Sequence, residues 1–367
     1  MKVAIIGAGV SGLSAALTLE RYGIKPDIFE KKSKSGETFD HVAGLLNIIN
    51  RPIKDPVLYL RKTYNIEIKP LNIIKRIVMH GPSVVTTIEN SKLGYMILRG
   101  QSEESLESQL FTKLKTRVNF DVNGEYKILK DKYDYLIIAT GNYKIPKELG
   151  CWQDLVDTWV RVADVLGDFD TQALIMWMNT LYAKSGYVYL IPFNKKRAVL
   201  VMIIPYIMKE EFQFFWETFF KIEKPDFEVI KFTDLQHNSG NCFPHQIENL
   251  LFVGNTGGAI EPFLGFGTLN SIVSGFLAAE CIVKEKNFEK SMAALTKKNI
   301  EMLEYRKALD LIDNNKLDKL IYTLGIPPVK KIIYDSNIDV LKIGSFLMKN
   351  TVNKLYYNFR RNRKKVR

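Results

Sequence analysis

The sequence predicts an α/β fold, α+β overall, in which helices pack on a parallel sheet and a mostly antiparallel sheet is inserted into the same chain. Three observations lead to this prediction. An apolar run at 3–6 leads through a glycine-spaced turn into a helical pattern and a second short strand, which makes a βαβ unit. Two more apolar runs, at 133–139 and 250–253, each stop at a glycine, as buried strands of a parallel sheet do. Between them, residues 152–204 have strand-like patterns that indicate a second sheet.

The composition is that of a globular protein with an excess of positive charge. Its 367 residues suffice for two domains, or for one domain with large insertions. Lys and Arg outnumber Asp and Glu by 52 to 40, a net charge of +12, which suggests an anionic partner such as a phosphate-bearing cofactor, an acidic protein or a membrane surface. Cys151, Cys242 and Cys281 are widely separated, so we expect no disulfide framework, no metal site and a cytoplasmic location. The longest apolar run, 198–208, is too short to span a bilayer.

The segment after the βαβ unit is less regular. Short β-like runs occur at 76–79 and 83–88, and residues 102–114 have the spacing of an amphipathic helix.

The second half of the chain adds strands and then helices. Strands are expected at 187–191 and 198–204, and a helix at 267–282. Residues 212–220 are unusually aromatic at helical spacing, which favours core packing, with the wall of an apolar tunnel as the alternative. Beyond residue 284 the chain is expected to be helical and is rich in lysine.

The turn after the first strand has the glycine spacing of a dinucleotide site. Gly7 permits a tight turn, Gly9 lets the backbone approach a pyrophosphate, and Gly12 lets the helix pack on the strand. The free N–H groups and positive dipole end of the following helix favour phosphate. Glu30 ends the second strand 18 residues after Gly12, where its carboxylate can accept hydrogen bonds from the adenosine ribose. This arrangement indicates a dinucleotide cofactor.

Three segments together resemble the FAD fingerprints of the p-hydroxybenzoate hydroxylase superfamily. They are residues 7–30, the strand end Ala139-Thr140-Gly141, and residues 251–267, which include Gly254, Asn255, Gly265 and Gly267. Within this superfamily the chain is most similar to the geranylgeranyl reductases. The resemblance implies noncovalent FAD as the cofactor, with the three segments as its binding site.

The first part of the implied site lies around the parallel strands. Ala139 and Gly141 end a strand beside the βαβ unit, where glycine allows close packing near the cofactor. Arg99 lies where relatives have an FAD-contacting arginine, whose guanidinium can bind a phosphate.

The second part lies in the third segment. Gly254 precedes Asn255, where relatives have an aspartate that bonds the ribityl chain, and asparagine keeps an acceptor oxygen without the charge. Gly265 and Gly267 lead into a helix whose N-terminus would face the pyrimidine end of the flavin.

We therefore predict a Rossmann-like FAD-binding domain with an inserted, mostly antiparallel β-sheet substrate domain and a helical C-terminal region. The FAD-binding domain is expected to be discontinuous. The predicted boundaries are 1–38, 95–150 and 237–288 for the FAD-binding domain, 39–94 and 151–236 for the substrate domain, and 289–367 for the C-terminal region with its basic tail.

A pair of tyrosines marks a candidate substrate face. Tyr187 and Tyr189 lie on one face of a strand, because alternate side chains of a strand point the same way. Geranylgeranyl reductases have a similar motif of two aromatics and a proline near substrate and flavin, so the resemblance implies substrate-binding roles for Tyr187, Tyr189 and Pro192. Flavin-dependent halogenases carry a comparable motif with tryptophans, and plain packing in the sheet is the alternative. His41 lies where the substrate-proximal segment of the relatives should be.

The predicted reaction is the reduction of carbon–carbon double bonds in a prenyl or other lipid-like substrate, by hydride transfer from reduced FAD. No side chain is assigned a catalytic role. One alternative is a flavin-dependent monooxygenase or halogenase of the same superfamily. Another is a non-catalytic FAD-binding protein.

Two further partners are expected, an electron donor and a membrane surface. No second GxGxxG lies between Gly141 and Gly254, so we expect the electron donor to dock transiently, as NAD(P)H or reduced ferredoxin would. The last eight residues carry six positive charges, which suggests peripheral contact with an anionic membrane on its inner face, a solvated tail being the alternative. No motif suggests nucleic-acid binding.

Overall fold

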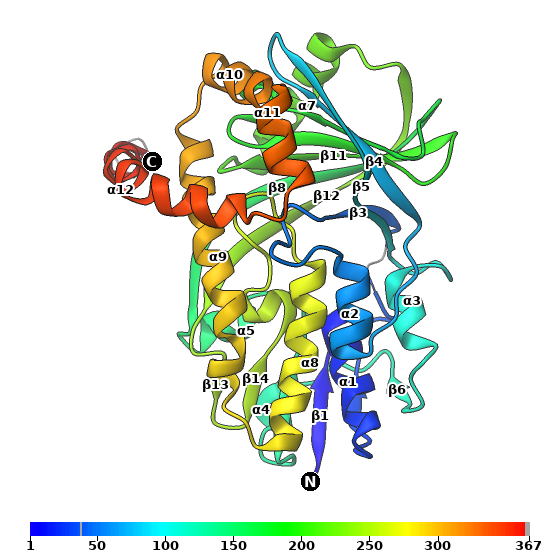
Figure 1. Ribbon diagram of the computed structural model, residues 1–367. Coiled ribbons are helices and arrows are strands. Elements are labelled where there is room, and N and C mark those ends of the chain that lie inside the picture. Colours follow the sequence, from blue (N-terminus) through cyan, green and yellow to red (C-terminus); the bar gives the residue numbers. More distant parts are fainter. Residues whose placement is uncertain (37–38, 364–367) are drawn as a thin grey trace.

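The computed structural model describes residues 1–36 and 39–363, apart from several side chains after residue 349. The chain forms two sheets, which lie one above the other in Figure 1. The lower sheet contains, in order, β13 (Gln246–Ile247), β14 (Leu250–Phe252), β7 (Tyr135–Ile138), β1 (Val3–Ile6), β2 (Asp27–Phe29) and β6 (Val118–Asn119). The upper sheet contains, in order, β12 (Phe227–Cys242), β8 (Trp152–Gly167), β11 (Arg197–Pro205), β10 (Tyr187–Pro192), β9 (Ala173–Trp177), β4 (Asn72–His80), β5 (Val85–Arg99) and β3 (His41–Leu46).

The lower sheet is parallel except for the pair β13 and β14. Its central strand is apolar on both faces: Val3 and Ile5 pack with α1 (Val10–Arg21) and α8 (Thr268–Lys284), while Ala4 and Ile6 pack against the opposite side. That opposite side is covered by α4 (Tyr126–Leu129) and α5 (Lys144–Glu148). A strand covered on both faces reads as a continuous apolar run, which is why this sheet was predictable.

The upper sheet is antiparallel except for the pair β4 and β9, which confirms the expected mostly antiparallel sheet. One face carries a core cluster that includes Tyr187. The other face is covered by α6 (Thr180–Ala183) and the aromatic helix α7 (Phe212–Glu223), whose buried rings include Phe212 and Phe219. The aromatic helix therefore belongs to the core, as its spacing favoured.

The C-terminal part is helical, as expected. Its elements are α9 (Phe288–Asp310), α10 (Asn314–Gly325), α11 (Pro327–Lys330), a π-helical turn (Lys331–Asp335) and α12 (Val340–Arg363). In Figure 1, α9 runs alongside both sheets, and α10 and α11 lie over the upper one. The predicted basic tail falls outside the described residues at 364–367 and outside the described side chains before them.

The remaining elements lie in the connections between these strands and helices. They are α2 (Pro56–Tyr64), α3 (Leu106–Phe111) and two 3₁₀ turns (Lys209–Glu211 and Gly254–Gly257). The helix expected at 102–114 is shorter in the structure, because the Ser105 side chain caps the N–H of Ser108 and starts the helix there. The predicted substrate domain has boundaries at residues 94 and 236. In the structure, β5 stays in the upper sheet as far as Arg99, and β12 stays in it as far as Cys242.

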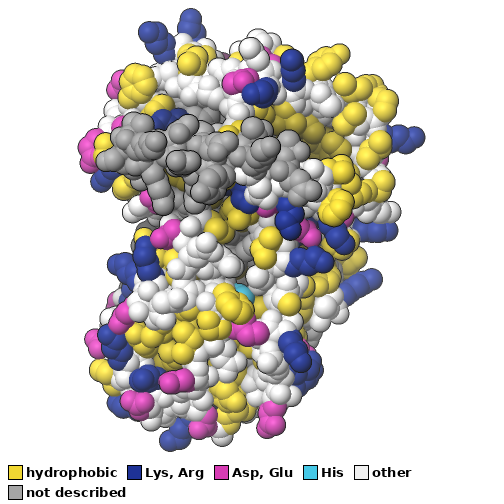
Figure 2. All heavy atoms as spheres, turned by 90° about the vertical axis from the view of Figure 1, so that its left-hand side faces the viewer, with side chains coloured by type: hydrophobic (Ala, Val, Ile, Leu, Met, Phe, Trp, Pro, Cys, Tyr) yellow, Lys and Arg dark blue, Asp and Glu magenta, His cyan; other side chains and the backbone are white. Residues whose placement is uncertain are grey.

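The charged side chains of one face can be followed in Figure 2. On the face shown in Figure 2, Lys and Arg side chains are spread over both halves, with Asp and Glu among them. In the described part of the chain, none of the helices has the length and apolar character needed to cross a membrane.

Candidate functional site

The three sequence segments meet at the carboxyl ends of β1, β7 and β14. A Cβ at Gly7, which has φ +105°, would lie 2.3 Å from the carbonyl oxygen of Ala139. A Cβ at Gly254 would lie 2.4 Å from Oγ of Ser11. The hydroxyl of Thr256 accepts a hydrogen bond from the Gly141 N–H at 3.0 Å. The first two contacts leave room for glycine alone at Gly7 and Gly254. All three bring the segments together at the edge where α/β sheets bind their ligands.

Gly9 lies in an open part of the first turn. A Cβ at Gly9 would meet no atom within 4 Å, whereas one at Gly12 would lie 2.0 Å from the carbonyl oxygen of Gly7. No side chain caps the N-terminus of α1, and its first turn contains no acidic residue. An open cradle at an uncapped helix N-terminus suits a pyrophosphate, so these residues fit a dinucleotide.

Glu30 lies beside the same turn. Its buried carboxylate accepts hydrogen bonds from the N–H groups of Ala8 and Lys32, at 2.8 and 3.0 Å. Each carboxylate oxygen can accept a further hydrogen bond, so Glu30 can still bind a ribose hydroxyl as predicted.

Arg99 lies at the N-terminus of α8, and part of its guanidinium is already engaged. Its Nε donates to Glu107 Oε1 at 2.7 Å, and its Nη1 donates to the hydroxyl of Thr268 at 3.3 Å. The carboxylate of Glu107 compensates the charge of Arg99, and this weakens the expected bidentate binding of a phosphate by the guanidinium. Through its bond to Thr268, Arg99 also fixes the start of α8.

The third segment leads from the glycine turn to the upper sheet. Asn255 lies in the 3₁₀ turn beside Gly254, and its side chain is partly buried. Gly265 and Gly267 lie in the loop before α8 and line a cavity against the upper sheet. No side chain caps α8, so its N-terminal N–H groups are available to an anionic group there.

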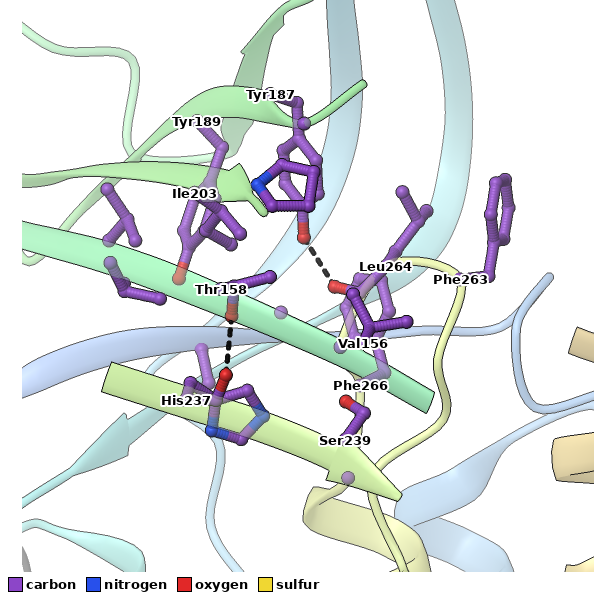
Figure 3. Close-up of a pocket in the computed structure, with 18 of the residues that line it drawn as sticks. Val156, Thr158, Tyr187, Tyr189, Ile203, His237, Ser239, Phe263, Leu264 and Phe266 are labelled. Carbon is purple, nitrogen blue, oxygen red and sulfur yellow. Dashed lines mark hydrogen bonds between the residues drawn. The ribbon is translucent and has the colours of Figure 1, made fainter. Parts of the chain in front are cut away.

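This first cavity has a volume of about 330 Å³, within the range of small-molecule sites. Its walls are mostly aliphatic and aromatic side chains of the upper sheet and of the loop 261–267 (Figure 3). Tyr187, Tyr189 and His41 all line it, so the structure brings these three predicted residues together. Pro192 is buried but does not line it, because it lies at an odd spacing from Tyr187 and Tyr189 and so on the opposite face of β10.

The two tyrosines have different environments although both point into the cavity (Figure 3). The hydroxyl of Tyr187 donates to the carbonyl oxygen of Leu264 in the loop 261–267. The hydroxyl of Tyr189 has no hydrogen-bond partner among the described residues, and Tyr189 lines the cavity. Burial raises the pKa of both phenols, so both stay protonated at neutral pH and act as hydrogen-bond donors.

A buried carboxylate organises the loop beside the tyrosines. Glu261 is 2% exposed, and its two oxygens accept hydrogen bonds from the N–H groups of Phe263, Leu264 and Phe266 at 2.6, 2.9 and 3.1 Å. Burial raises the pKa of the Glu261 carboxyl, and the three backbone N–H groups act in the opposite direction. Glu261 therefore fixes the loop 261–267, which accepts the hydrogen bond from Tyr187 and leads to the start of α8.

We expect Glu261→Gln to destabilise the protein by about 1–3 kcal/mol. Glutamine keeps one acceptor oxygen, so its amide group would face a backbone N–H, donor against donor. Urea denaturation of the purified variant measures the loss. A free energy of unfolding equal to that of the unchanged protein would show that Glu261 does not hold the loop.

The sequence analysis missed two charged residues of this region, Glu261 and Arg306. Arg306 lines the first cavity, is buried, and forms an ion pair with Asp310 at 2.8 Å. The spacing of Arg306 and Asp310 by four residues in a helical segment was the available signal for that pair. For Glu261, which directly precedes Pro262, the sequence contains no comparable pattern.

Comparisons with known proteins find a family model and several solved structures to which this chain is similar. Residues 1–164 match the family described as pyridine nucleotide-disulphide oxidoreductase. A search of curated proteins finds no match. Among solved structures, a geranylgeranyl bacteriochlorophyll reductase-like protein from Thermoplasma acidophilum is similar with 16% identity, 94% of each chain covered and a TM-score of 0.71.

Two further similar structures are halogenating enzymes. The flavin-dependent brominase Bmp2 has 13% identity, covers 97% of this chain and 99% of its own, and has a TM-score of 0.65. The halogenase PltM, solved as a mutant in complex with FAD, has 10% identity, covers 100% of this chain and 92% of its own, and has a TM-score of 0.66.

The fold and the site define the class of protein. The chain has the fold of the FAD-dependent oxidoreductases, which confirms the predicted fold class. FAD is the cofactor assigned to it, because the glycine cradle, the uncapped helices and the matched family agree on that group.

Proposed function

We propose that the protein is an FAD-dependent reductase of carbon–carbon double bonds in a prenyl or other lipid-like substrate. The observation that carries the proposal is the first cavity: an apolar space with a free tyrosine hydroxyl, beside the loop that leads to α8. The similarity to a reductase-like protein at a TM-score of 0.71 supports it.

The residues of this chain would bind, orient and shield the substrate. Residues 7–12 and 254–267 with the N-termini of α1 and α8 would hold FAD, and reduced FAD supplies a hydride when it is bound. The aliphatic walls would exclude water around the alkene. Tyr187 would fix the loop 261–267 through Leu264.

Tyr189 has a separate part in this proposal. Because its pKa is raised by burial, its hydroxyl is a poor acid and serves as a hydrogen-bond donor and acceptor. It would orient a polar group of the substrate or the water that delivers the proton to the second alkene carbon. Hydride and proton together account for the two hydrogens gained.

The test uses protein reduced with dithionite in the absence of oxygen. Dithionite replaces the natural donor, for which NAD(P)H and reduced ferredoxin are the proposals. We expect a polyprenyl lipid to reoxidise the flavin and to gain two hydrogens per turnover. Flavin that stays reduced until air is admitted, with a product that gains oxygen, would favour the second candidate.

The second candidate is a flavin-dependent monooxygenase or halogenase. The similarity to a brominase and a halogenase over nearly the whole chain is the observation that supports it. A product that gains halogen in the presence of air and halide would identify the halogenase. Flavin that responds to neither lipid nor oxygen would instead favour a non-catalytic FAD-binding protein.

We expect Tyr189→Ala to slow the anaerobic half-reaction by about 100-fold, because small displacements at the reacting centre are costly. Tyr189→Phe keeps the ring and tests the hydroxyl alone. Phe214→Ala is the matched control, because Phe214 is exposed on α7 and does not line the cavity. Equal rates for Tyr189→Ala and Phe214→Ala would remove the substrate role of Tyr189.

A further inference from the structure

A second cavity lies on the other side of the loop 261–267. It also has a volume of about 330 Å³ and is enclosed by α2, α8, α9 and the segment 49–53. It shares Gly44, Phe266, Gly267 and Thr268 with the first cavity. Its wall is mostly apolar, and α8 and α9 contribute Val273, Leu277 and Leu295 among others.

One end of this cavity carries positive charge. Arg51 is 8% exposed, and its Nη1 donates to the carbonyl oxygen of Ile338 at 2.5 Å. The other guanidinium N–H groups of Arg51 have no hydrogen-bond partner in the described part of the chain, and Arg51 lines the cavity. Lys298, also in the wall, donates to the carbonyl oxygen of Arg51 at 3.1 Å.

The acidic groups nearby do not cancel both cations. Asp339 forms an ion pair with Lys298 at 3.5 Å and lies beyond ion-pair distance of Arg51. Both oxygens of Glu261, which also lines the cavity, are held by backbone N–H groups. Burial lowers the pKa of Arg51, while the charge of Asp339 opposes this shift. A buried guanidinium with unused donors is a site for an anion, and its planar fork matches carboxylate or phosphate.

We propose that the second cavity binds a single-chain amphiphile, with its carboxylate or phosphate at Arg51 and its alkyl chain between α8 and α9. The charge at one end and the apolar walls elsewhere match the two parts of such a molecule. Arg51, Lys298 and Leu295 line the second cavity and not the first, so the proposal does not require the reaction proposed for the first cavity.

The test is calorimetric titration of the FAD-loaded protein with decanoate, decyl phosphate and decanol, each below its micelle concentration. We expect at least one anion to bind about 10-fold or more tightly than decanol, which matches it in chain length but has no charge. The tighter anion identifies the head group. Equal affinity for decanol and both anions would overturn the proposal, as would displacement of FAD by the probe.

Three variants locate the site. Arg51→Gln should weaken anion binding by about 10- to 100-fold, and Arg51→Lys, which keeps the charge, should retain more of it. Arg61→Gln is the matched control on α2, because the Arg61 side chain is 67% exposed, and it should change nothing. Anion binding unchanged in Arg51→Gln would overturn the proposal.

Ala294→Phe tests the alkyl end without touching a charge. Ala294 lines the cavity on α9, and a phenyl ring there would fill the space of the chain. We expect it to abolish binding of both anions while FAD content and thermal unfolding stay as in the unchanged protein. Full binding by this folded variant would contradict the proposal.

Discussion

Gly9→Val should yield a folded protein that has lost its flavin. Gly9 has φ −79° and ψ −177°, an extended conformation that valine adopts freely, and a Cβ there meets no atom within 4 Å. The valine side chain would fill the space that a pyrophosphate needs. Loss of one or two charge-assisted hydrogen bonds corresponds to FAD binding weaker by about 100-fold.

Two measurements separate this effect from unfolding. Circular dichroism and the unfolding midpoint of the FAD-free protein should be unchanged in Gly9→Val. Gly12→Val is the contrasting variant, because its Cβ would lie 2.0 Å from the carbonyl oxygen of Gly7 and must disturb the fold itself. A Gly9→Val protein that keeps full FAD content would show that the cofactor does not lie in this turn.

Asp310→Ala should lower the free energy of unfolding by about 3–5 kcal/mol. Asp310 is buried and accepts hydrogen bonds from Arg306 at 2.8 Å, Ser185 at 2.7 Å, Tyr206 at 3.0 Å and Tyr356 at 3.1 Å. Its removal leaves the buried Arg306 without its counter-ion, and it uncouples α9 from the upper sheet and from α12. Urea denaturation followed by circular dichroism measures the loss.

The double variant Arg306→Met/Asp310→Leu is the test of the cause. If the uncompensated charge dominates, the double variant should be more stable than Asp310→Ala, because it buries no unpaired ion. Glu148→Ala removes one partner of an exposed ion pair with Lys127 and should leave the unfolding midpoint unchanged. A loss in Asp310→Ala as small as that in Glu148→Ala would contradict the role given to this network.

The parallel sheet and its turn were predictable because their signals are local. Val3 to Ile6 is a short apolar run, and Gly7, Gly9 and Gly12 follow at a spacing that backbone geometry requires. The structure adds the reason why two of them are glycine, in the contacts that a Cβ at Gly7 or Gly12 would make.

The substrate side was only partly predictable, because its residues converge from distant segments. Strand alternation placed Tyr187 and Tyr189 on one face, but not the bond from Tyr187 to Leu264, 77 residues away in sequence. The burial of Glu261 depends on the path of its loop between the sheets. The charged end of the second cavity combines Arg51 with Lys298 and Asp339. These residues are far apart in the sequence, so no local pattern predicts that they meet.

The most direct measurement of the central claim is the cofactor content of the unchanged protein. Purified protein, incubated with excess FAD, freed of unbound cofactor and then denatured by heat, should release FAD in a ratio of about one per chain, identified by chromatography and mass. A flavin absorbance spectrum before denaturation and none in the protein pellet afterwards would show that the cofactor is noncovalent. Protein that is colourless after this incubation and releases no flavin would contradict the account.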